Sequence, residues 1–369
     1  MDSRQLNRRR LLGAVGATAT AALAGCLQFT DNIPLVGRTD DANDGEIVED
    51  PDGPKPVLAD ESLYVGHSAE TLRSAATGGG PGVDGIPSID DLSFESADES
   101  DLDDDHPVFG VVRNGVAKAY PQYVLVWHEI VNDTFGDEPV AVTYCPLTGT
   151  AQGFGRGETT FGVSGDLVNS NLIMYDRGTG TRWPQIAATG TQGPFEGESL
   201  TEFRVIWTTW DNWREAHPDT DVLTSDTGYQ RRYGNDPYGE YAPPSDYYAD
   251  DRLIFEPLET TDDEHPKEVV IGARTTDGAI AFNKERLLDE SVLQGETDEA
   301  AFVAVADPDL ETGYVYRQNG ASVDPAGDGQ YTVDGETASA DELPLDRVLA
   351  FDGMHFAWHA FYPGLTYVD

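Results

Sequence analysis

The sequence predicts an α+β fold that is rich in strand and divided into two related halves. Short apolar runs separated by Gly, Asn, Asp and Pro recur through most of the chain, which is typical of strands joined by turns. Helical spacing is confined to a few short stretches. The order of elements in residues 84–228 recurs in residues 266–369. With 369 residues, of which 39% are hydrophobic, the chain is long enough for two ordinary cores.

The first half opens with a predicted β-hairpin. Residues 108–112 and 116–120 are largely apolar, and Asn114-Gly115 lies between them. Asn-Gly favours the type I′ turn, whose two central residues both need a positive φ. Pro121 then ends the strand and fits the first turn of a helix. Apolar residues recur at helical spacing after it, so we expect a helix over residues 122–132.

The remaining elements of this half are predicted to be short. Residues 140–144 form an apolar run that ends at Cys145, because the proline that follows interrupts a strand ladder. Polar turns are expected at residues 164–166 and 169–171. Further strands are expected over residues 159–163, 172–175, 181–185 and 200–207, and a short helix over residues 211–216.

A second set of elements follows in the same order. Residues 269–274 and 279–282 match the opening hairpin, residues 286–293 match the helix, and residues 301–306 match the strand before Cys145. In this alignment Glu290 replaces His128 and Asp307 replaces Cys145. We interpret the pattern as a tandem duplication whose second copy has lost the Cys–His pair. The alternative is chance similarity between two strand-rich stretches.

The first residues are predicted to direct export rather than to fold. Residues 7–12, Asn-Arg-Arg-Arg-Leu-Leu, resemble a twin-arginine motif, and the apolar run after them is short for a membrane span. The Leu-Ala-Gly-Cys run at residues 23–26 resembles a lipobox. We therefore expect the twin-arginine export machinery to act on the chain and residues 1–25 to be removed. A lipid on Cys26 would then anchor the protein to the outer face of the cell membrane. The alternative is an uncleaved N-terminal anchor.

The body after this signal is strongly acidic. Residues 26–83 are rich in Asp, Gly and Pro and read as a tether and lead-in. In total 67 acidic residues stand against 23 basic ones, for a net charge of −44. Such a surface stays hydrated in strong salt and repels phosphate backbones, so we expect no nucleic-acid partner. The charge and the signal together resemble an exported haloarchaeal surface protein, although the acidic run at residues 101–105 could also bind cations.

The residues best suited to chemistry are Cys145, His128 and Glu129. Cys145 is the only cysteine expected in the folded body, and it follows a predicted strand. Three interpretations stay open. Cys145 and His128 could hold one transition metal, with copper, zinc and iron as candidates. Cys145 could instead be a nucleophile, with His128 as base and Glu129 or Asn132 orienting it. Finally, both side chains could simply belong to the core.

A tyrosine-rich insert at residues 229–265 is the second candidate feature. It is either a long loop packed on the core or a lid over a site. Together with nearby polar residues it suggests an alternative function, a non-catalytic surface module that binds a small molecule. The same polar residues could equally serve as turn formers. The candidate ligand-binding residues are Ser164, Asn169, Asn171, Tyr175, Arg232 and Tyr238.

Several motifs give the chain from about Asp84 to its end a specific resemblance to an uncharacterised family, domain of unknown function 3179. Many relatives have a second cysteine where Thr148 stands, which argues against a dithiol centre here. The resemblance implies a shared fold and no particular reaction. The motifs are Asp84-Gly-Ile-Pro, Ala119-Tyr-Pro, Trp127-His-Glu-Ile-Val-Asn-Asp133, Thr143-Tyr-Cys-Pro-Leu147, Gly162-Val-Ser-Gly165, Asn169-Ser-Asn-Leu172, Met174-Tyr-Asp-Arg177, Asp236-Pro-Tyr238 and Phe356-Ala-Trp-His-Ala-Phe-Tyr-Pro363.

Overall fold

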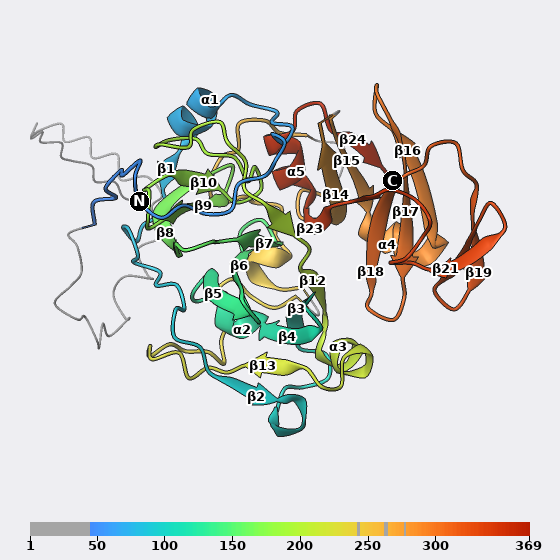
Figure 1. Ribbon diagram of the computed structural model, residues 1–369, viewed down its shortest axis with the longest axis horizontal. Helices are drawn as coiled ribbons and strands as arrows, with labels where there is room; N and C mark the ends of the chain where they lie inside the picture. The colour runs from blue at the N-terminus through green and yellow to red at the C-terminus, as the bar shows by residue number, and fades with distance from the viewer. Residues whose placement is uncertain (1–44, 242–243, 262–264, 277) are drawn as a thin grey trace, which may run out of the picture. The chain divides into compact units, whose positions relative to one another are not determined.

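The computed structural model describes residues 45–369, apart from residues 242–243, 262–264 and 277 (Figure 1). The predicted signal peptide, Cys26 and residues 27–44 of the tether therefore lie outside the described residues. Within the described part of the chain, no helix is both long and apolar enough to cross a membrane. Strands dominate, and they form several small sheets with few helices between them.

The predicted hairpin of the first half is confirmed. Strands β3 (Pro107–Arg113) and β4 (Val116–Pro121) pair antiparallel, with Val108 opposite Pro121. Asn114 and Gly115 have φ angles of 53° and 75°, as a type I′ turn requires. The hairpin belongs to a five-stranded sheet of order β12-β3-β4-β13-β2. Its other strands are β12 (Ile206–Thr209), β13 (Asp221–Leu223) and β2 (Phe94–Ser96).

Two further sheets complete the first half. One has the order β11-β7-β6-β5 and includes the predicted strand that ends at Cys145. Its strands are β5 (Ile130–Phe135), β6 (Glu138–Cys145), β7 (Thr150–Gly155) and β11 (Glu202–Phe203). The other has the order β1-β8-β9-β10. Its strands are β1 (Thr77–Gly78), β8 (Phe161–Val168), β9 (Asn171–Asp176) and β10 (Arg182–Pro184).

The second half contains three sheets. Two of them resemble the hairpin sheet and the Cys145 sheet of the first half in strand order, and the third does not. Strands β14 (Val269–Thr275) and β15 (Gly278–Asn283) form the hairpin of the sheet β23-β14-β15-β24. The second sheet has the order β16-β17-β18-β22, and the third sheet the order β19-β20-β21. The other strands are β16 (Val292–Glu296), β17 (Ala301–Asp307), β18 (Thr312–Arg317), β19 (Val323–Gly327), β20 (Gln330–Val333), β21 (Glu336–Ser339), β22 (Arg347–Val348), β23 (Ala350–Met354) and β24 (Thr366–Val368).

The two halves also agree in strand direction and register. In the first hairpin Gly110 lies opposite Ala119, and in the second Gly272 lies opposite Ala281. A short strand pairs parallel to the second hairpin strand in both halves, β13 with β4 and β24 with β15. In the neighbouring sheets, β6 pairs with β7 as β17 pairs with β18. Two sheets of each half therefore pair their strands in a similar order, whereas the third sheet of each half differs.

One predicted helix is wrong for most of its length. Helix α2 covers only Gln122–Leu125, and residues 130–132 belong to β5. The apolar residues at helical spacing are buried, but those from Ile130 onward are buried as one strand of a sheet that pairs with β6. In the second half α4 (Lys284–Glu290) likewise ends before β16, within the stretch expected to be helical. Pairing with a neighbouring strand overrides local helical spacing in both places.

Other boundaries differ less from expectation. The predicted turn at residues 164–166 lies inside β8, where the register shifts between Val163 and Leu167. The predicted strand at residues 200–207 is two strands, β11 and β12. The short helix is confirmed as α3 (Trp210–Ala216). Helices α1 (Ala69–Ala75) and α5 (His355–Phe361) complete the set.

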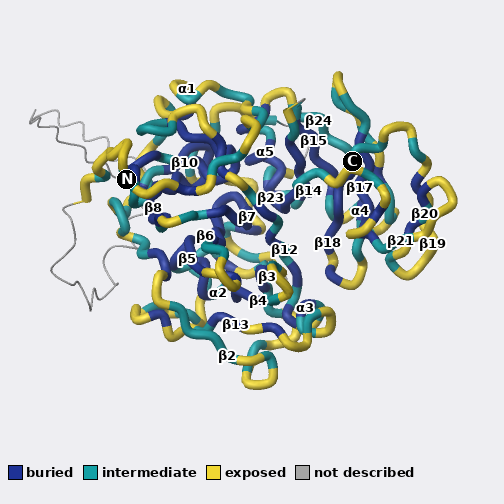
Figure 2. The backbone as a smooth tube through the Cα atoms, viewed as in Figure 1, coloured by how far each residue is buried: buried dark blue, intermediate teal, exposed yellow. Residues whose placement is uncertain are grey.

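The tyrosine-rich insert contributes little regular structure, with one 3₁₀ turn at Asp246–Tyr248 (η3). Its aromatic rings nevertheless pack on the sheets. Tyr248 is buried, and Tyr238, Tyr241 and Tyr247 lie against core residues. Figure 2 shows the buried strands of both halves, with exposed residues gathered in the connecting loops. The insert is therefore part of the packed structure around the first half.

A glycine in each hairpin lies against a tryptophan from a helix later in the chain, Trp213 of α3 or Trp358 of α5. A Cβ atom on Gly110 would lie 2.1 Å from the Trp213 ring, and one on Gly272 would lie 2.0 Å from the Trp358 ring. Both rings are fully buried and have no room to move away. We expect Gly110→Ala and Gly272→Ala each to lower the free energy of unfolding by about 1–3 kcal/mol or more through overpacking.

Chemical denaturation of the two variants measures this effect. Gly78→Ala is the matched control, because Gly78 lies in an exposed edge strand with no atom within 4 Å of an added Cβ. A loss in the Gly110 or Gly272 variant no greater than that of the control would contradict the proposed packing.

Candidate functional site

His128 and Glu129 lie in a tight bend between α2 and β5. The amides of both residues donate to the carbonyl of Leu125, and the Tyr144 amide donates to the Glu129 carbonyl at 2.8 Å. Glu129 has a φ of 60°, a conformation that costs a residue with a side chain roughly 1–3 kcal/mol. This last hydrogen bond holds the backbone of the bend at the end of β6, one residue before Cys145.

The His128 imidazole is fixed by partners at both nitrogens. Its Nδ1–H donates to the Pro87 carbonyl at 2.7 Å, since a carbonyl can only accept. Its Nε2 lies 2.7 Å from the Tyr233 hydroxyl, which therefore donates to it. Burial lowers the pKa of His128 to about 4. The imidazole is thus neutral at physiological pH, with its tautomer set by Pro87.

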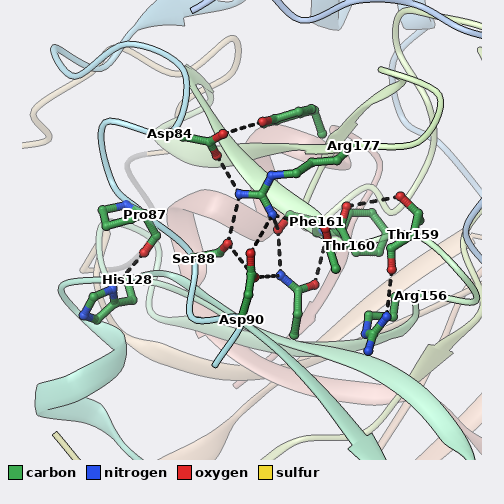
Figure 3. A network of polar contacts seen from close by, with 12 residues as sticks. Asp84, Pro87, Ser88, Asp90, His128, Arg156, Thr159, Thr160, Phe161 and Arg177 are labelled. Carbon is green, nitrogen blue, oxygen red and sulfur yellow. Dashed lines mark hydrogen bonds and ion pairs between the residues drawn. The ribbon is translucent and has the colours of Figure 1, made fainter. Parts of the chain in front are cut away.

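An arginine network holds the loop that carries Pro87 (Figure 3). Arg177 Nη2 donates to Asp84 Oδ1 at 2.9 Å and to Ser88 Oγ at 3.1 Å, while Nη1 donates to Asp90 Oδ2 at 3.2 Å. These contacts lie on both sides of Pro87 in the sequence. Because the ion pairs are partly exposed, their individual energies are small, and the main effect of the network is to position the loop.

The Cys145 thiol is enclosed. Its side chain is buried, and Sγ lies 3.6 Å from the Ser170 carbonyl, to which it donates. Burial, and next the charge of Glu129, raise the pKa of the thiol to about 11, although donors from Thr148 and Leu172 partly offset this. The resting form of Cys145 is therefore the protonated thiol.

Glu129 is the most unusual group at this place. Burial raises the pKa of its carboxyl to about 8. Glu129 is 6% exposed, and none of the side-chain hydrogen bonds among the described residues reaches its carboxyl, whereas buried carboxyls normally have partners. Tyr238 lies beside both groups, since burial and then the charges of Glu129 and Cys145 raise its pKa. Tyr247 lies beside Cys145, since burial and then the charge of Cys145 raise its pKa. We call Glu129, Cys145, Tyr238 and Tyr247 the acid–thiol site.

The tyrosine-rich insert covers this site. Tyr247 donates from its hydroxyl to the Leu147 carbonyl at 2.7 Å, in the turn directly after Cys145. The Tyr238 and Tyr247 rings meet edge to face, with centroids 6.0 Å apart. Lys267 fixes the covering segment, because its ammonium group donates to the carbonyls of Tyr247, Asp250 and Arg252.

The geometry does not suit the expected Cys145–His128 metal centre. Among the described residues, no three His, Cys, Asp or Glu side chains are grouped so that they could hold a metal ion. Both ring nitrogens of His128 already have protein partners. A metal bound through His128 would have to displace Pro87 or Tyr233, and Glu129 is the one acidic group that the described residues place beside Cys145.

The predicted ligand-binding residues do not converge on one cavity. Most of them bond to other parts of the fold, as turn and strand residues do. Tyr238 alone belongs to the acid–thiol site, and Arg232 is exposed. The bonds are Ser164 Oγ to the Ile173 carbonyl, Asn169 Nδ2 to the Ala360 carbonyl, Asn171 Nδ2 to Thr148 and Gln185, and Tyr175 Oη to Asp84.

The partners that complete the site were missed from sequence. Pro87, Tyr233 and Tyr247 lie far along the chain from the residues they contact. The Asp-Gly-Ile-Pro motif and the six tyrosines of the insert marked the correct segments without showing which side chains face His128 or Cys145. Only the fold supplies those contacts.

The fold and this site define a strand-rich α+β domain with a covered thiol and a buried acid. The chain belongs to the family described as "Protein of unknown function (DUF3179)", which it matches over residues 83–365. This confirms the family resemblance seen in its motifs. No curated protein and no solved structure matched the chain.

Proposed function

We propose that this protein is a thiol-dependent enzyme acting on a small molecule at the acid–thiol site. The observation that carries the proposal is Glu129, a buried carboxyl in a strained bend with no hydrogen-bond partner among the described residues, beside a buried thiol. Stability alone disfavours such a group. Proteins retain unfavourable buried acids mainly where chemistry needs them.

In the proposed step Cys145 adds to an electrophilic carbonyl carbon of the substrate. The Sγ–C bond forms, and the electron pair of the carbonyl π bond moves to its oxygen. The Sγ proton passes to the Glu129 carboxylate. A carboxyl with a pKa near 8 is well suited to exchange a proton near neutral pH. Tyr238 and Tyr247 exclude water and supply hydroxyl groups near the reacting atoms.

Glu129 replaces His128 as the base in this proposal. His128 bonds to Pro87 and Tyr233, so its nitrogens face the Asp84-containing loop and the insert. His128 is a positioning residue that links these two segments to the bend. From sequence, Glu129 was expected to orient His128. The contacts instead favour His128 as the residue that positions Glu129.

Labelling of Cys145 by iodoacetamide tests the proposal. In a chain that carries Cys26→Ser, we expect the labelling rate to rise as the pH passes through about 8, because Glu129 becomes able to take the thiol proton. Glu129→Gln should remove the component of that rise centred near pH 8, leaving only the continuous increase of a thiol whose pKa is about 11, and should slow labelling at pH 8 by roughly tenfold or more. Mass spectrometry after timed quenching measures both rates, and Cys145→Ser gives the background.

Two outcomes would sink the proposal. One is a native thiol that iodoacetamide labels only as fast as global unfolding exposes it. The other is a pH profile that is the same with and without Glu129.

Two alternatives from the sequence are separated by the Cys145→Ser variant. A metal centre would show about one bound copper, zinc or iron per chain, lost in the variant. A non-catalytic module would keep its small ligand in both proteins. The packing of the insert on the core is compatible with such a module, but the internal bonding of Asn169 and Asn171 does not favour it.

We also propose that the two halves arose by tandem duplication. The shared strand order and register support this origin. At the place of the Glu129 bend the second half has Ser291, which also has a positive φ, of 68°. Asp307 stands where Cys145 does, at the end of β17. The second half thus keeps the backbone of the site without its thiol.

Export and anchoring complete the proposal. The twin-arginine motif and the lipobox support a protein held at the outer face of the cell membrane by a lipid on Cys26. The acidic surface supports function in strong salt. The enzyme would then meet substrates supplied from outside the cell.

A further inference from the structure

A pocket of about 300 Å³ shares no residue with the acid–thiol site. It lies where the segment before α1, strand β11 of the first half and strand β14 of the second half meet. Leu63, Leu200 and Leu349 give it an aliphatic wall. Its volume is at the lower end of the range for small-molecule sites.

The polar side of this pocket is an ion pair between the two halves. Arg274 Nη2 donates to Glu202 Oε1 at 2.7 Å, and the two side chains are only 2% and 6% exposed. Gln152 Nε2 donates to the same Oε1 at 3.0 Å. Replacing such a pair with apolar residues is often neutral or stabilising, so stability alone gives little reason to keep it.

The ion pair leaves most of its hydrogen-bonding capacity unused. A guanidinium has five N–H donors, and that of Arg274 makes a single hydrogen bond within the described residues. Its buried Nε–H has no partner there. Glu202 Oε2 likewise accepts no hydrogen bond from the described residues. The buried unpaired Nε–H of Arg274 costs about 1–3 kcal/mol.

We propose that this pocket binds a small aliphatic molecule through a primary carboxamide group. The carboxamide oxygen accepts from the free N–H groups of Arg274, and the carboxamide NH₂ donates to Glu202 Oε2. Its aliphatic part lies on the leucine wall. A carboxylate fits less well, because its second oxygen would meet the Glu202 carboxylate and Asp60 adds a further negative charge at the rim.

Binding of isobutyramide to the full chain, followed by ligand-observed NMR titration, tests the proposal. We expect isobutyramide to bind and sodium isobutyrate to bind about tenfold more weakly or worse. Arg274→Lys keeps the positive charge but loses the planar set of donors, and should weaken isobutyramide binding by about tenfold.

Two further variants test the pocket without changing Arg274 or Glu202. Ala59→Phe fills the pocket and leaves Arg274 and Glu202 in place, so it should abolish binding. Leu345→Phe adds a similar ring to a different pocket, of about 490 Å³, and should leave binding unchanged.

The proposal fails if isobutyramide does not bind, or if it binds the Ala59→Phe variant as tightly as the natural chain. Equal affinities for isobutyramide and isobutyrate would overturn the carboxamide assignment. Ordered waters that satisfy Arg274 in a crystal soaked with isobutyramide would overturn it as well.

Discussion

Replacing Glu129 with glutamine is expected to stabilise the protein at alkaline pH. Burial raises the pKa of this carboxyl to about 8, from an ordinary value of 4.5. Between these values the folded state binds more protons than the unfolded state, so natural stability falls as the pH rises from about 4.5 to 8. Glutamine cannot ionise and avoids this loss. We expect the variant to gain about 3–5 kcal/mol in free energy of unfolding at pH 9, and little at pH 4.

Denaturant unfolding at pH 4, 6, 8 and 9, with the salt concentration held constant, measures the difference. Glu290→Gln is the matched control, because Glu290 is an exposed residue at the end of α4 and should change stability by about 0.5 kcal/mol or less. If Glu129→Gln and the natural chain lose stability in parallel with rising pH, the pKa of Glu129 is not raised in the folded protein, and Glu129 is not the near-neutral base proposed above.

A stability gain combined with lost thiol reactivity would identify the acid as a functional group. Mutations that remove a strained or unsatisfied group from a site commonly increase stability and reduce activity. If Glu129 had a structural role, Glu129→Gln would instead lower the free energy of unfolding, since glutamine would then remove a stabilising interaction. The two experiments on this one residue therefore separate function from packing.

The sequence predicted the elements whose signal is local. Asn114-Gly115 requires a positive φ at two successive residues, and this alone selects a tight hairpin. The strand that ends at Cys145 was equally clear from its apolar run and the following proline. Both predicted hairpins, β3–β4 and β14–β15, are present in the structure.

The helix expected over residues 122–132 was wrong because its signal depends on the environment. Helical spacing shows that residues are buried, but residues from Ile130 onward are buried by pairing with β6. The contacts of the candidate site also depend on the fold. Sequence singled out His128, Glu129 and Cys145, yet His128 contacts residues 41 and 105 positions away. Which side chain meets which is a property of the folded chain.

The second large effect concerns Asp133, the last residue of the Trp-His-Glu motif. Asp133 accepts hydrogen bonds from the buried Lys118 ammonium at 2.8 Å and 2.9 Å and from the Tyr120 hydroxyl at 2.5 Å. The Lys118 Nζ also lies 4.4 Å from the centre of the Phe94 ring and 4.7 Å from that of Phe135. Asp133→Ala leaves this charge without its counterion. We expect a loss of about 3–5 kcal/mol in free energy of unfolding, measured by denaturant unfolding.

A double variant shows whether that loss comes from the unpaired charge. Lys118→Met removes the cation and keeps an unbranched side chain between the two rings, so combining it with Asp133→Ala should recover much of the stability. The recovery, as a coupling energy in a double-mutant cycle, should reach about 1–3 kcal/mol. Additive losses in the two single variants would contradict the pairing. Because the Asp133 contacts lie within the fold, we also expect Lys118→Met/Asp133→Ala to leave the pH profile of Cys145 labelling unchanged, which distinguishes this structural member of the motif from Glu129.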